Sequence, residues 1–355
     1  MSGGGRIAPR FAADLERWGN APALIGECGD AISYGQLAEM ADRFAASLPG
    51  EVRLLAIEAQ SRVEAVTAYL GALRSNIPVI LHSGGAAADH ILDHYRPDAH
   101  YAPDGTGGGW SLKVAPIPWE CAPHAELALL LSTSGSTGSP KLVRLSAAAL
   151  DANACAIATY LGLAPADRAV TSLPLSYSYG LSVLNSHLAA GASILVTELG
   201  ITDPAFRDLL QAHGVTGLTG VPHSYELMER CGLLENLPAN VKTLTQAGGR
   251  MAQDLAKRVA ERAHRIGARF FIMYGQTEAT ARIAYLRPEL LSRYPGAIGQ
   301  AIPGGEIWLE HENGTRAAMG EAGELIYRGP NVMMGYASER RHLADPPGPD
   351  VLRTG

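Results

Sequence analysis

Residues 130–141 read Leu-Leu-Ser-Thr-Ser-Gly-Ser-Thr-Gly-Ser-Pro-Lys and lie between two apolar runs, residues 127–131 and residues 142–145. Each run is typical of a short buried strand. Between them, glycines allow backbone N–H groups to crowd around an anion, the hydroxyls add donors, and Lys141 adds a positive charge. The stretch therefore predicts a phosphate-binding loop held between two strands.

Two other interpretations of this loop are weaker. A flexible linker has a similar Gly/Ser composition, but no charged or proline-rich spacer separates this loop from the strands on either side. A Walker loop needs its lysine directly after the second glycine, whereas Ser139 and Pro140 follow Gly138 here. Nucleotide phosphate binding is the favoured interpretation.

Outward from the loop, apolar runs alternate with amphipathic segments. Before it, residues 54–57 and 77–81 read as strands around a helix at residues 63–73, which is a βαβ unit. After it, strands at residues 169–172, 193–196, 215–218, 241–244 and 269–272 alternate with helices around residues 180–190, 204–212, 224–231 and 251–266. This alternation predicts an α/β fold with doubly wound, mostly parallel sheets flanked by helices.

The pattern changes near residue 296. Short strands at residues 307–310 and 324–328, with an Asn313-Gly314 turn between them, predict a small distorted β-barrel subdomain. We therefore expect an organisation into a first α/β subdomain at about residues 1–170, a second at 171–290 and the barrel-like subdomain at 291–355.

Composition narrows the class of protein. The 355 residues are 47% hydrophobic and 18% charged, and the net charge of −6 argues against non-specific nucleic-acid binding. No apolar stretch is long enough to cross a bilayer, and no signal peptide is visible. The four cysteines form no C-x-x-C pair. We expect a cytoplasmic protein that binds small molecules or other proteins.

A second motif, Tyr274-Gly275-Gln276-Thr277-Glu278, follows the predicted strand at residues 269–272. Ligands of doubly wound sheets bind at the carboxyl ends of the strands. An aromatic ring, a glycine, a hydroxyl and a carboxylate suit a base, a phosphate and its magnesium ion. Taken alone, the motif fits an ordinary strand exit with a core tyrosine and a solvated glutamate equally well.

Together the two motifs resemble those of the adenylate-forming (ANL) superfamily, which contains acyl- and aryl-CoA synthetases, nonribosomal peptide adenylation domains and firefly luciferase. The resemblance runs from about residue 32 to residue 355 and points to the large N-terminal domain of an AMP-forming ligase. It implies that Tyr274 stacks on adenine, Thr277 contacts the α-phosphate, Glu278 ligates Mg²⁺, and Gly248-Gly249-Arg250 lines the adenine edge.

The resemblance thereby implies a complete set of site residues. The catalytic set is Lys141, Thr277 and Glu278. The ATP-binding set is Thr133, Ser134, Gly135, Ser136, Thr137, Gly138, Lys141, Gly248, Gly249, Arg250, Tyr274, Gly275, Gln276 and Thr277.

The implied reaction has two steps. A carboxylate attacks the α-phosphorus of ATP bound with Mg²⁺, pyrophosphate leaves, and the acyl-adenylate passes its acyl group to a thiol. CoA and a carrier protein are both candidate acceptors, and the sequence does not identify the acceptor, the acid or the oligomeric state. Two alternatives remain: a non-catalytic nucleotide-binding module of the same fold, and a small-molecule kinase, which would release ADP instead of AMP.

The substrate pocket implied by the resemblance contains Tyr177, Tyr179, Gly180, His223, Gly248 and Met273. Tyr177 replaces a gating histidine of many CoA ligases, and residues 174–180 contain no aspartate to hold the ammonium group of an amino acid. Met273 would shorten an acyl channel. We expect an aryl or a short-to-medium acyl acid, not a simple α-amino acid. Met273 and the two tyrosines would serve equally well as core residues.

The chain ends at Arg353-Thr354-Gly355. In the family, the corresponding segment is followed by a ribose-binding aspartate, a hinge and a small C-terminal domain that carries a catalytic lysine. We expect this domain to be absent here. On this expectation, the 355 residues alone bind ATP weakly and have severely impaired adenylation activity.

Overall fold

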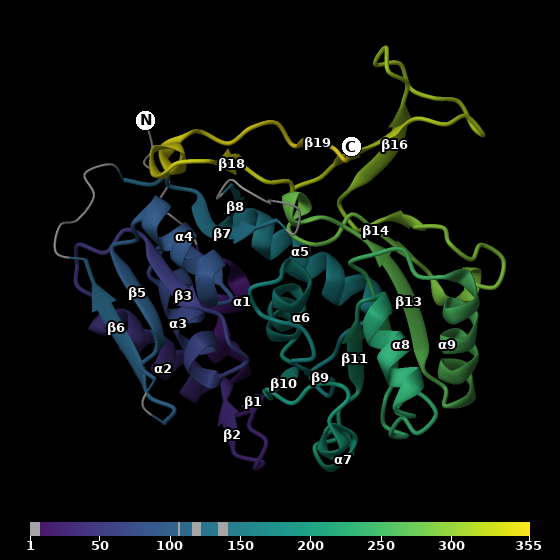
Figure 1. The fold of residues 1–355 in the computed structure, drawn as a ribbon, viewed down its shortest axis with the longest axis horizontal. Coiled ribbons are helices and arrows are strands. Elements are labelled where there is room, and N and C mark those ends of the chain that lie inside the picture. The colour runs from purple at the N-terminus through teal and green to yellow at the C-terminus, as the bar shows by residue number, and fades with distance from the viewer. Residues whose placement is uncertain (1–7, 106, 116–121, 134–140) are drawn as a thin grey trace.

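The computed structural model describes residues 8–105, 107–115, 122–133 and 141–355. Two large sheets lie beside each other, with helices on their faces, and the last strands of the chain run along one edge of both (Figure 1). The predicted α/β class with mostly parallel sheets is confirmed.

The larger sheet has nine strands. In spatial order they are β15 (Gln300–Ala301), β14 (Ala284–Leu286), β13 (Arg269–Tyr274), β12 (Thr243–Gln246), β11 (Gly217–Gly220), β9 (Arg168–Val170), β10 (Ser193–Leu195), β1 (Pro22–Ile25) and β2 (Ala31–Ser33). The strands from β13 to β1 are parallel, and the outer three pair antiparallel.

The second sheet has seven strands. In spatial order they are β18 (Gly335–Ala337), β8 (Leu142–Ser146), β7 (Leu127–Ser132), β4 (Val79–His82), β3 (Leu55–Glu58), β5 (Ala99–Pro103) and β6 (Trp110–Val114). The two apolar runs around the predicted phosphate loop are β7 and β8, which pair antiparallel with Ser132 opposite Leu142. The loop thus joins two neighbouring strands, and its ends are held close together.

Nine α-helices lie in the part of the chain that the structure describes. They are α1 (Arg10–Ala13), α2 (Tyr34–Ser47), α3 (Val63–Arg74), α4 (Gly85–Tyr95), α5 (Ala147–Leu161), α6 (Ser178–Ala189), α7 (Pro204–Ala212), α8 (Pro222–Arg230) and α9 (Gln253–Arg265). Hydroxyl and carboxylate side chains cap several of their first turns: Ser33 caps α2, Ser146 caps α5 and Asp203 caps α7. Within the same residues, no helix is both long and apolar enough to cross a membrane.

The predicted barrel at residues 291–355 is not confirmed. β16 (Glu306–Glu310), β17 (Glu324–Arg328) and β19 (Val351–Arg353) form an open antiparallel sheet. β15 and β18 pair instead with the two larger sheets. The pairing of β18 with β8 is non-local and β15 is only two residues long, so the short-strand pattern of the sequence revealed neither pairing.

The sheets also cross the expected subdomain boundaries. β1 and β2 precede residue 34 but belong to the nine-stranded sheet, whereas β18 extends the seven-stranded one. A single buried cluster contains side chains from both sheets, including Leu24 of β1, Ile57 of β3 and Ile194 of β10. The division into three subdomains therefore stays a prediction.

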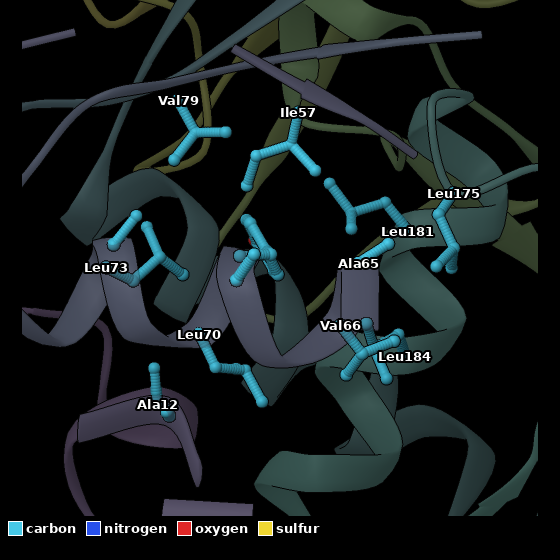
Figure 2. Close-up of a cluster of buried hydrophobic side chains, with 14 of the residues drawn as sticks. Ala12, Ile57, Ala65, Val66, Leu70, Leu73, Val79, Leu175, Leu181 and Leu184 are labelled. Atoms are coloured by element: carbon cyan, nitrogen blue, oxygen red, sulfur yellow. The ribbon is translucent and has the colours of Figure 1, made fainter. Parts of the chain in front are cut away.

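Helices α5 and α6 lie between the two sheets (Figure 1). The main buried cluster contains Leu70 and Val66 of α3 together with Leu181 and Leu184 of α6, and the close-up in Figure 2 shows these side chains below Ile57 of β3. Because α6 begins at Ser178, this packing fixes the position of its first turn.

Candidate active site

A cleft of about 570 Å³ opens at the edge where the chain ends. Its walls come from the segments that follow β9, β12 and β13, which is the carboxyl edge of the parallel strands, and from β18 and β19. Eight of the predicted site residues line it: Thr133, Tyr177, Tyr179, Gly248, Gly275, Gln276, Thr277 and Glu278.

Lys141 and Glu278 meet at one side chain, Tyr336. The Lys141 ammonium nitrogen lies 3.2 Å from the centroid of the Tyr336 ring. The Tyr336 hydroxyl donates a hydrogen bond of 2.8 Å to Glu278 Oε1. Burial, and then the Glu278 carboxylate, raise the pKa of Tyr336 to about 12, so its hydroxyl remains a donor. The end of the predicted phosphate loop and the 274–278 motif thus converge on one cleft.

A short 3₁₀ turn, η2 (Thr277–Ala279), presents the hydroxyl and the carboxylate of the motif. The Thr277 hydroxyl lies 3.3 Å from the Ser178 hydroxyl at the start of α6. Gly275 is required just before this turn, because a Cβ there would collide with the backbone carbonyl of Ala281. The turn is therefore packed closely against the segment that follows it.

That following segment has an unusual backbone. Thr280 and Ala281 have φ values of 57° and 118°, a region that residues other than glycine seldom adopt. The buried Asn331 side chain holds the segment by donating to the carbonyls of Ala279 and Arg282, at 2.7 Å and 2.8 Å. These bonds keep the chain in the turn that brings Arg282 to the cleft wall.

Gly248 forms the opposite wall. Its φ is 78°, and a Cβ added there would collide with the Tyr177 hydroxyl. The Gln246 side-chain amide donates to the Gly249 carbonyl at 2.8 Å and so fixes the turn. Glycine is thus needed at residue 248 for both its conformation and its closeness to Tyr177.

Tyr177 and Tyr179 lie deeper in the cleft, where burial raises the pKa of both hydroxyls. The positive charge of Arg282 acts on both rings in the opposite direction. The Tyr179 hydroxyl donates to Thr245 Oγ1 at 3.0 Å. These two predicted pocket residues therefore lie together beside a cation that the sequence analysis did not single out.

Four predicted nucleotide-binding residues are not among the described residues that line the cleft: Lys141, which contacts Tyr336 of the lining, and Gly249, Arg250 and Tyr274. Gly249 and Arg250 are exposed beside it. The Tyr274 ring packs against a buried cluster that includes Ile283, and its hydroxyl accepts a bond of 3.2 Å from the Gln276 amide. The roles of Gly249, Arg250 and Tyr274 toward adenine stay predictions.

Three predicted pocket residues also lie elsewhere among the described residues. Met273 is 4% exposed, and its sulfur accepts a bond from the Tyr160 hydroxyl, as expected of a core residue. Gly180 is buried within α6, where a Cβ would collide with the Pro174 carbonyl. His223 is exposed at the start of α8 and pairs with Glu226 at 3.1 Å.

The central residues of the phosphate loop, Ser134, Gly135, Ser136, Thr137 and Gly138, lie outside the described residues. Their predicted contacts with phosphate stay predictions. No group of three or more metal-ligating side chains occurs within the ranges that the structure describes. Glu278 is a single carboxylate in the cleft, which fits Mg²⁺, since this ion commonly takes one or two protein carboxylates together with phosphate oxygens.

Among the lining residues that the predicted site did not include, Tyr336 and Arg282 are the two with the most informative contacts. Tyr336 lies 58 residues beyond Glu278 and reaches it only because β18 pairs with β8. Arg282 is close to the motif in sequence, but a single arginine among apolar residues does not show whether its side chain is buried or reaches solvent. Neither residue carries a local pattern that could have identified it.

The family model described as AMP-binding enzyme matches residues 98–337, which is more than half of the chain. The chain therefore belongs to the AMP-binding enzyme family, and the resemblance inferred from the two motifs is confirmed.

Similar curated proteins include the indoleacetate–CoA ligase of Aromatoleum aromaticum, 29% identical over 64% of this chain and 44% of its own length. The 2-succinylbenzoate–CoA ligase of Bacillus velezensis is 30% identical over 59% of this chain and 42% of its own length. The chain thus spans less than half the length of these relatives.

Two solved structures have the same fold. The chain matches VinN with a TM-score of 0.79 and 23% identity, covering 94% of this chain and 90% of VinN. It matches the O-succinylbenzoate coenzyme A synthetase of Bacillus subtilis in complex with AMP with a TM-score of 0.78 and 22% identity, covering 98% of this chain and 75% of the synthetase.

Proposed function

We propose that the protein activates a carboxylic acid with ATP, releasing pyrophosphate and forming an acyl-adenylate, and then transfers the acyl group to a thiol. The proposed acid is an aryl or a short-to-medium acyl acid and not a simple α-amino acid, and the thiol belongs to CoA or a carrier protein. The observation that carries this proposal is the convergence of Lys141 and Glu278 on Tyr336 in one cleft.

The names of similar proteins support the class of reaction. Relatives include CoA ligases for indoleacetate and 2-succinylbenzoate and the feruloyl-CoA synthase of an Amycolatopsis species. One relative from Pseudomonas fluorescens is an L-proline–carrier protein ligase, which supports the carrier protein as an alternative acceptor. The structure of the Bacillus subtilis synthetase in complex with AMP supports an adenine nucleotide as the proposed ligand of this chain.

The residues of the cleft suit the chemistry of the first step. In the proposal, Thr277 donates its hydroxyl to the α-phosphate, Lys141 contacts the outer phosphates, and Glu278 holds Mg²⁺. Bound Mg²⁺ would neutralise charge on the departing pyrophosphate. The protein's main task is to hold two anions in position, and hydroxyls, a cation and a carboxylate-bound metal can do this without forming a covalent bond to the enzyme.

A titration of the 355-residue chain tests this proposal. We expect a non-hydrolysable acyl-sulfamoyl-adenosine analogue to bind at least about a hundredfold tighter than AMP in calorimetry, because it joins the nucleotide to the acid. A non-catalytic nucleotide module would gain nothing from the acyl part. Because adenylation by the 355 residues alone is expected to be severely impaired, turnover with ATP and a panel of acids is followed over long incubations. The nucleotide released should be AMP, whereas ADP would indicate a kinase and overturn the proposal.

A pair of glutamate variants tests the assigned roles. Glu278→Gln should weaken binding of ATP in the presence of Mg²⁺ by about tenfold or more, because a charged ligand is lost. Glu226→Gln removes a carboxylate that pairs with His223 away from the cleft, and it should leave binding unchanged. Equal affinities for the two variants would contradict the role of Glu278.

A further inference from the structure

Arg282 is an arginine with few polar partners. Its side chain is among the largest fully buried ones, with 2% of the residue exposed. Its Nη1 donates to the Ala281 carbonyl at 3.0 Å, and its Nε lies 3.4 Å from the Met273 sulfur. The guanidinium carbon lies 4.0 Å from the centroid of the Tyr179 ring. Among the described residues, no carboxylate forms an ion pair with it.

Two other buried arginines of this protein have more oxygen acceptors, although Nε of Arg144 has no hydrogen-bond partner. Arg340 is 6% exposed and forms an ion pair of 2.6 Å with Asp98. Arg144 is 3% exposed and donates to the carbonyls of Asp345, Met334 and Pro346. A buried charge that lacks such partners destabilises the folded state. A neutral side chain would fill the same volume without this penalty, so packing alone does not explain Arg282.

The position of Arg282 suggests a ligand. It lines the main cleft, and with Tyr179 it also lines a narrow inner pocket of about 30 Å³ beside Met273. The reacting end of the cleft is marked by Thr277 and Glu278, on the other side of the turn at residues 280–281. Arg282 is therefore a cation that borders both the cleft that contains Thr277 and Glu278 and the inner pocket beside Met273.

The surroundings of Arg282 hold it in this position. The Asn331 amide fixes its carbonyl at 2.8 Å, and the Tyr179 ring lies against its guanidinium group. Burial raises the pKa of Tyr160 to about 12, and the charge of Arg282 and a side-chain hydrogen bond between the two residues oppose this increase. The charge therefore acts on neutral tyrosines and, within the described part of the chain, has no protein anion paired with it.

We propose that Arg282 binds a second anionic group of the acid, so that the substrate is a dicarboxylic acid. This inference rests on the proposed function. The reacting carboxylate would lie towards Thr277 and Glu278, and the distal carboxylate would form a charge-assisted, bidentate pair with the Arg282 guanidinium. Binding of the substrate would then supply the anionic partner for Arg282.

The test compares two analogues on the full chain. One joins a butyryl group to sulfamoyl-adenosine, and the other joins a succinyl group, which adds a distal carboxylate to a chain of the same length. Phthalic and benzoic analogues form a second, aromatic pair. In at least one pair, we expect the dicarboxylate analogue to bind at least about tenfold tighter by calorimetry. Equal affinities within both pairs would overturn the proposal.

Substitutions of Arg282 test whether this residue causes the preference for the dicarboxylate analogue. Arg282→Met should abolish the preference for the dicarboxylate analogue while AMP binding is kept, and Arg282→Lys should retain part of it. Arg168→Met is a matched control, because Arg168 bonds Ser193 and the His213 carbonyl away from the cleft, and it should keep the full preference. A preference that persists in Arg282→Met would also overturn the proposal.

Two further outcomes are informative. Should Arg282→Met fail to fold, Arg282→Gln is titrated beside Arg282→Lys, and only the neutral variant should lose the preference. If neither analogue of either pair binds better than AMP, the proposed function itself fails and this inference fails with it. If the monocarboxylate analogues bind well and the distal carboxylate adds nothing, only this inference is overturned.

Discussion

Gly248 shows how single atoms shape the cleft. Its φ of 78° and its closeness to the Tyr177 hydroxyl leave no room for a side chain. We predict that Gly248→Ala lowers the free energy of unfolding by about 1–3 kcal/mol through backbone strain and collision. It should also weaken AMP binding, because the displaced Tyr177 hydroxyl enters the cleft. Urea denaturation and calorimetry measure the two effects.

Two matched variants separate the causes. Gly267 has a similar φ of 72°, and a Cβ added there would meet no described heavy atom within 4 Å, so Gly267→Ala reports the strain without the collision. Tyr177→Phe removes the colliding hydroxyl and should restore part of the stability lost in Gly248→Ala. If Gly248→Ala and Gly267→Ala destabilise equally and bind AMP equally, the collision has no role.

At the residue scale, contiguous motifs were predictable and lone residues were not. Thr277 and Glu278 were singled out because the five-residue motif and the phosphate loop together resemble the adenylate-forming superfamily, whereas the motif taken alone fits an ordinary strand exit equally well. Met273 sits in the same stretch, yet it faces the core, since neighbouring strand residues alternate between faces. Arg282 lies inside the protein because the two residues before it, Thr280 and Ala281, have positive φ angles, and the sequence gives no indication of this conformation.

At the scale of elements, the turn at residues 279–282 depends on Asn331. This side chain is 1% exposed, donates to Ala279 and Arg282, and accepts a bond of 2.6 Å from the Tyr327 hydroxyl. We predict that Asn331→Ala destabilises the protein by about 2–4 kcal/mol, since it leaves buried carbonyls without donors. AMP binding should weaken as well, because η2 is no longer held.

Chemical denaturation and calorimetry check this prediction. Asn236→Ala is the control, because the Asn236 amide bonds the Gly232 carbonyl in an exposed loop after α8. It should cost much less stability and leave AMP affinity unchanged. Loss of stability in Asn331→Ala with unaltered AMP binding would show that the turn does not position the cleft.

Two buried histidines, His187 and His82, make the stability of the protein depend on pH. His187 lies in α6 and is 5% exposed, and burial lowers its pKa to about 4. His82 lies in β4, and its pKa is also lowered to about 4, first by burial and then by the nearby His100. Both pKa values lie below the unfolded value near 6.5, so the unfolded state binds the additional protons. Stability is therefore complete above about pH 6.5 and is lost as pH falls towards 4.

We predict that the free energy of unfolding at pH 5 is lower than at pH 7 by about 2 kcal/mol for each of these two histidines. Urea denaturation at the two pH values measures the change. His187→Asn should remove about half of this difference in the free energy of unfolding between pH 7 and pH 5. Substitution of the exposed His264 by Asn should leave the difference unchanged. A stability that is constant between pH 7 and pH 5 would contradict this assignment.

Elements with a clear local hydrophobic pattern could be predicted from the sequence, whereas strand pairings between distant parts of the chain could not. The strands β3, β4, β7 and β8 and the alternating elements from β9 to β13 matched the periodic patterns within a few residues. Of the strands after residue 296, only β16 and β17 were predicted, and β15, β18 and β19 were not. The place of β18 depends on β8, a partner almost two hundred residues earlier in the sequence. Hydrophobic periodicity contains no information about such partners.

At the scale of the whole molecule, the two large sheets share one core. The buried cluster joins Ile57 of the seven-stranded sheet and Ile194 of the nine-stranded sheet through Leu184 of α6 and Val66 of α3. The cleft is bounded by residues from both sheets and from the C-terminal strands, including Tyr336 and Gln276. A shared core implies that neither sheet keeps its stability when the packing between them is weakened.

We therefore predict that the described sheets unfold as one cooperative unit. Leu184 is 1% exposed, and Leu184→Ala should destabilise the protein by about 2–5 kcal/mol through the lost side chain and the cavity. Hydrogen exchange measured by mass spectrometry should show equal losses of protection in β3 and β12, which belong to different sheets. Val114→Ala, at an exposed position of β6, is the control and should change neither. If protection falls in β12 but not in β3, the sheets are separate folding units, and the cleft between their edges would have to be treated as an interface that can open.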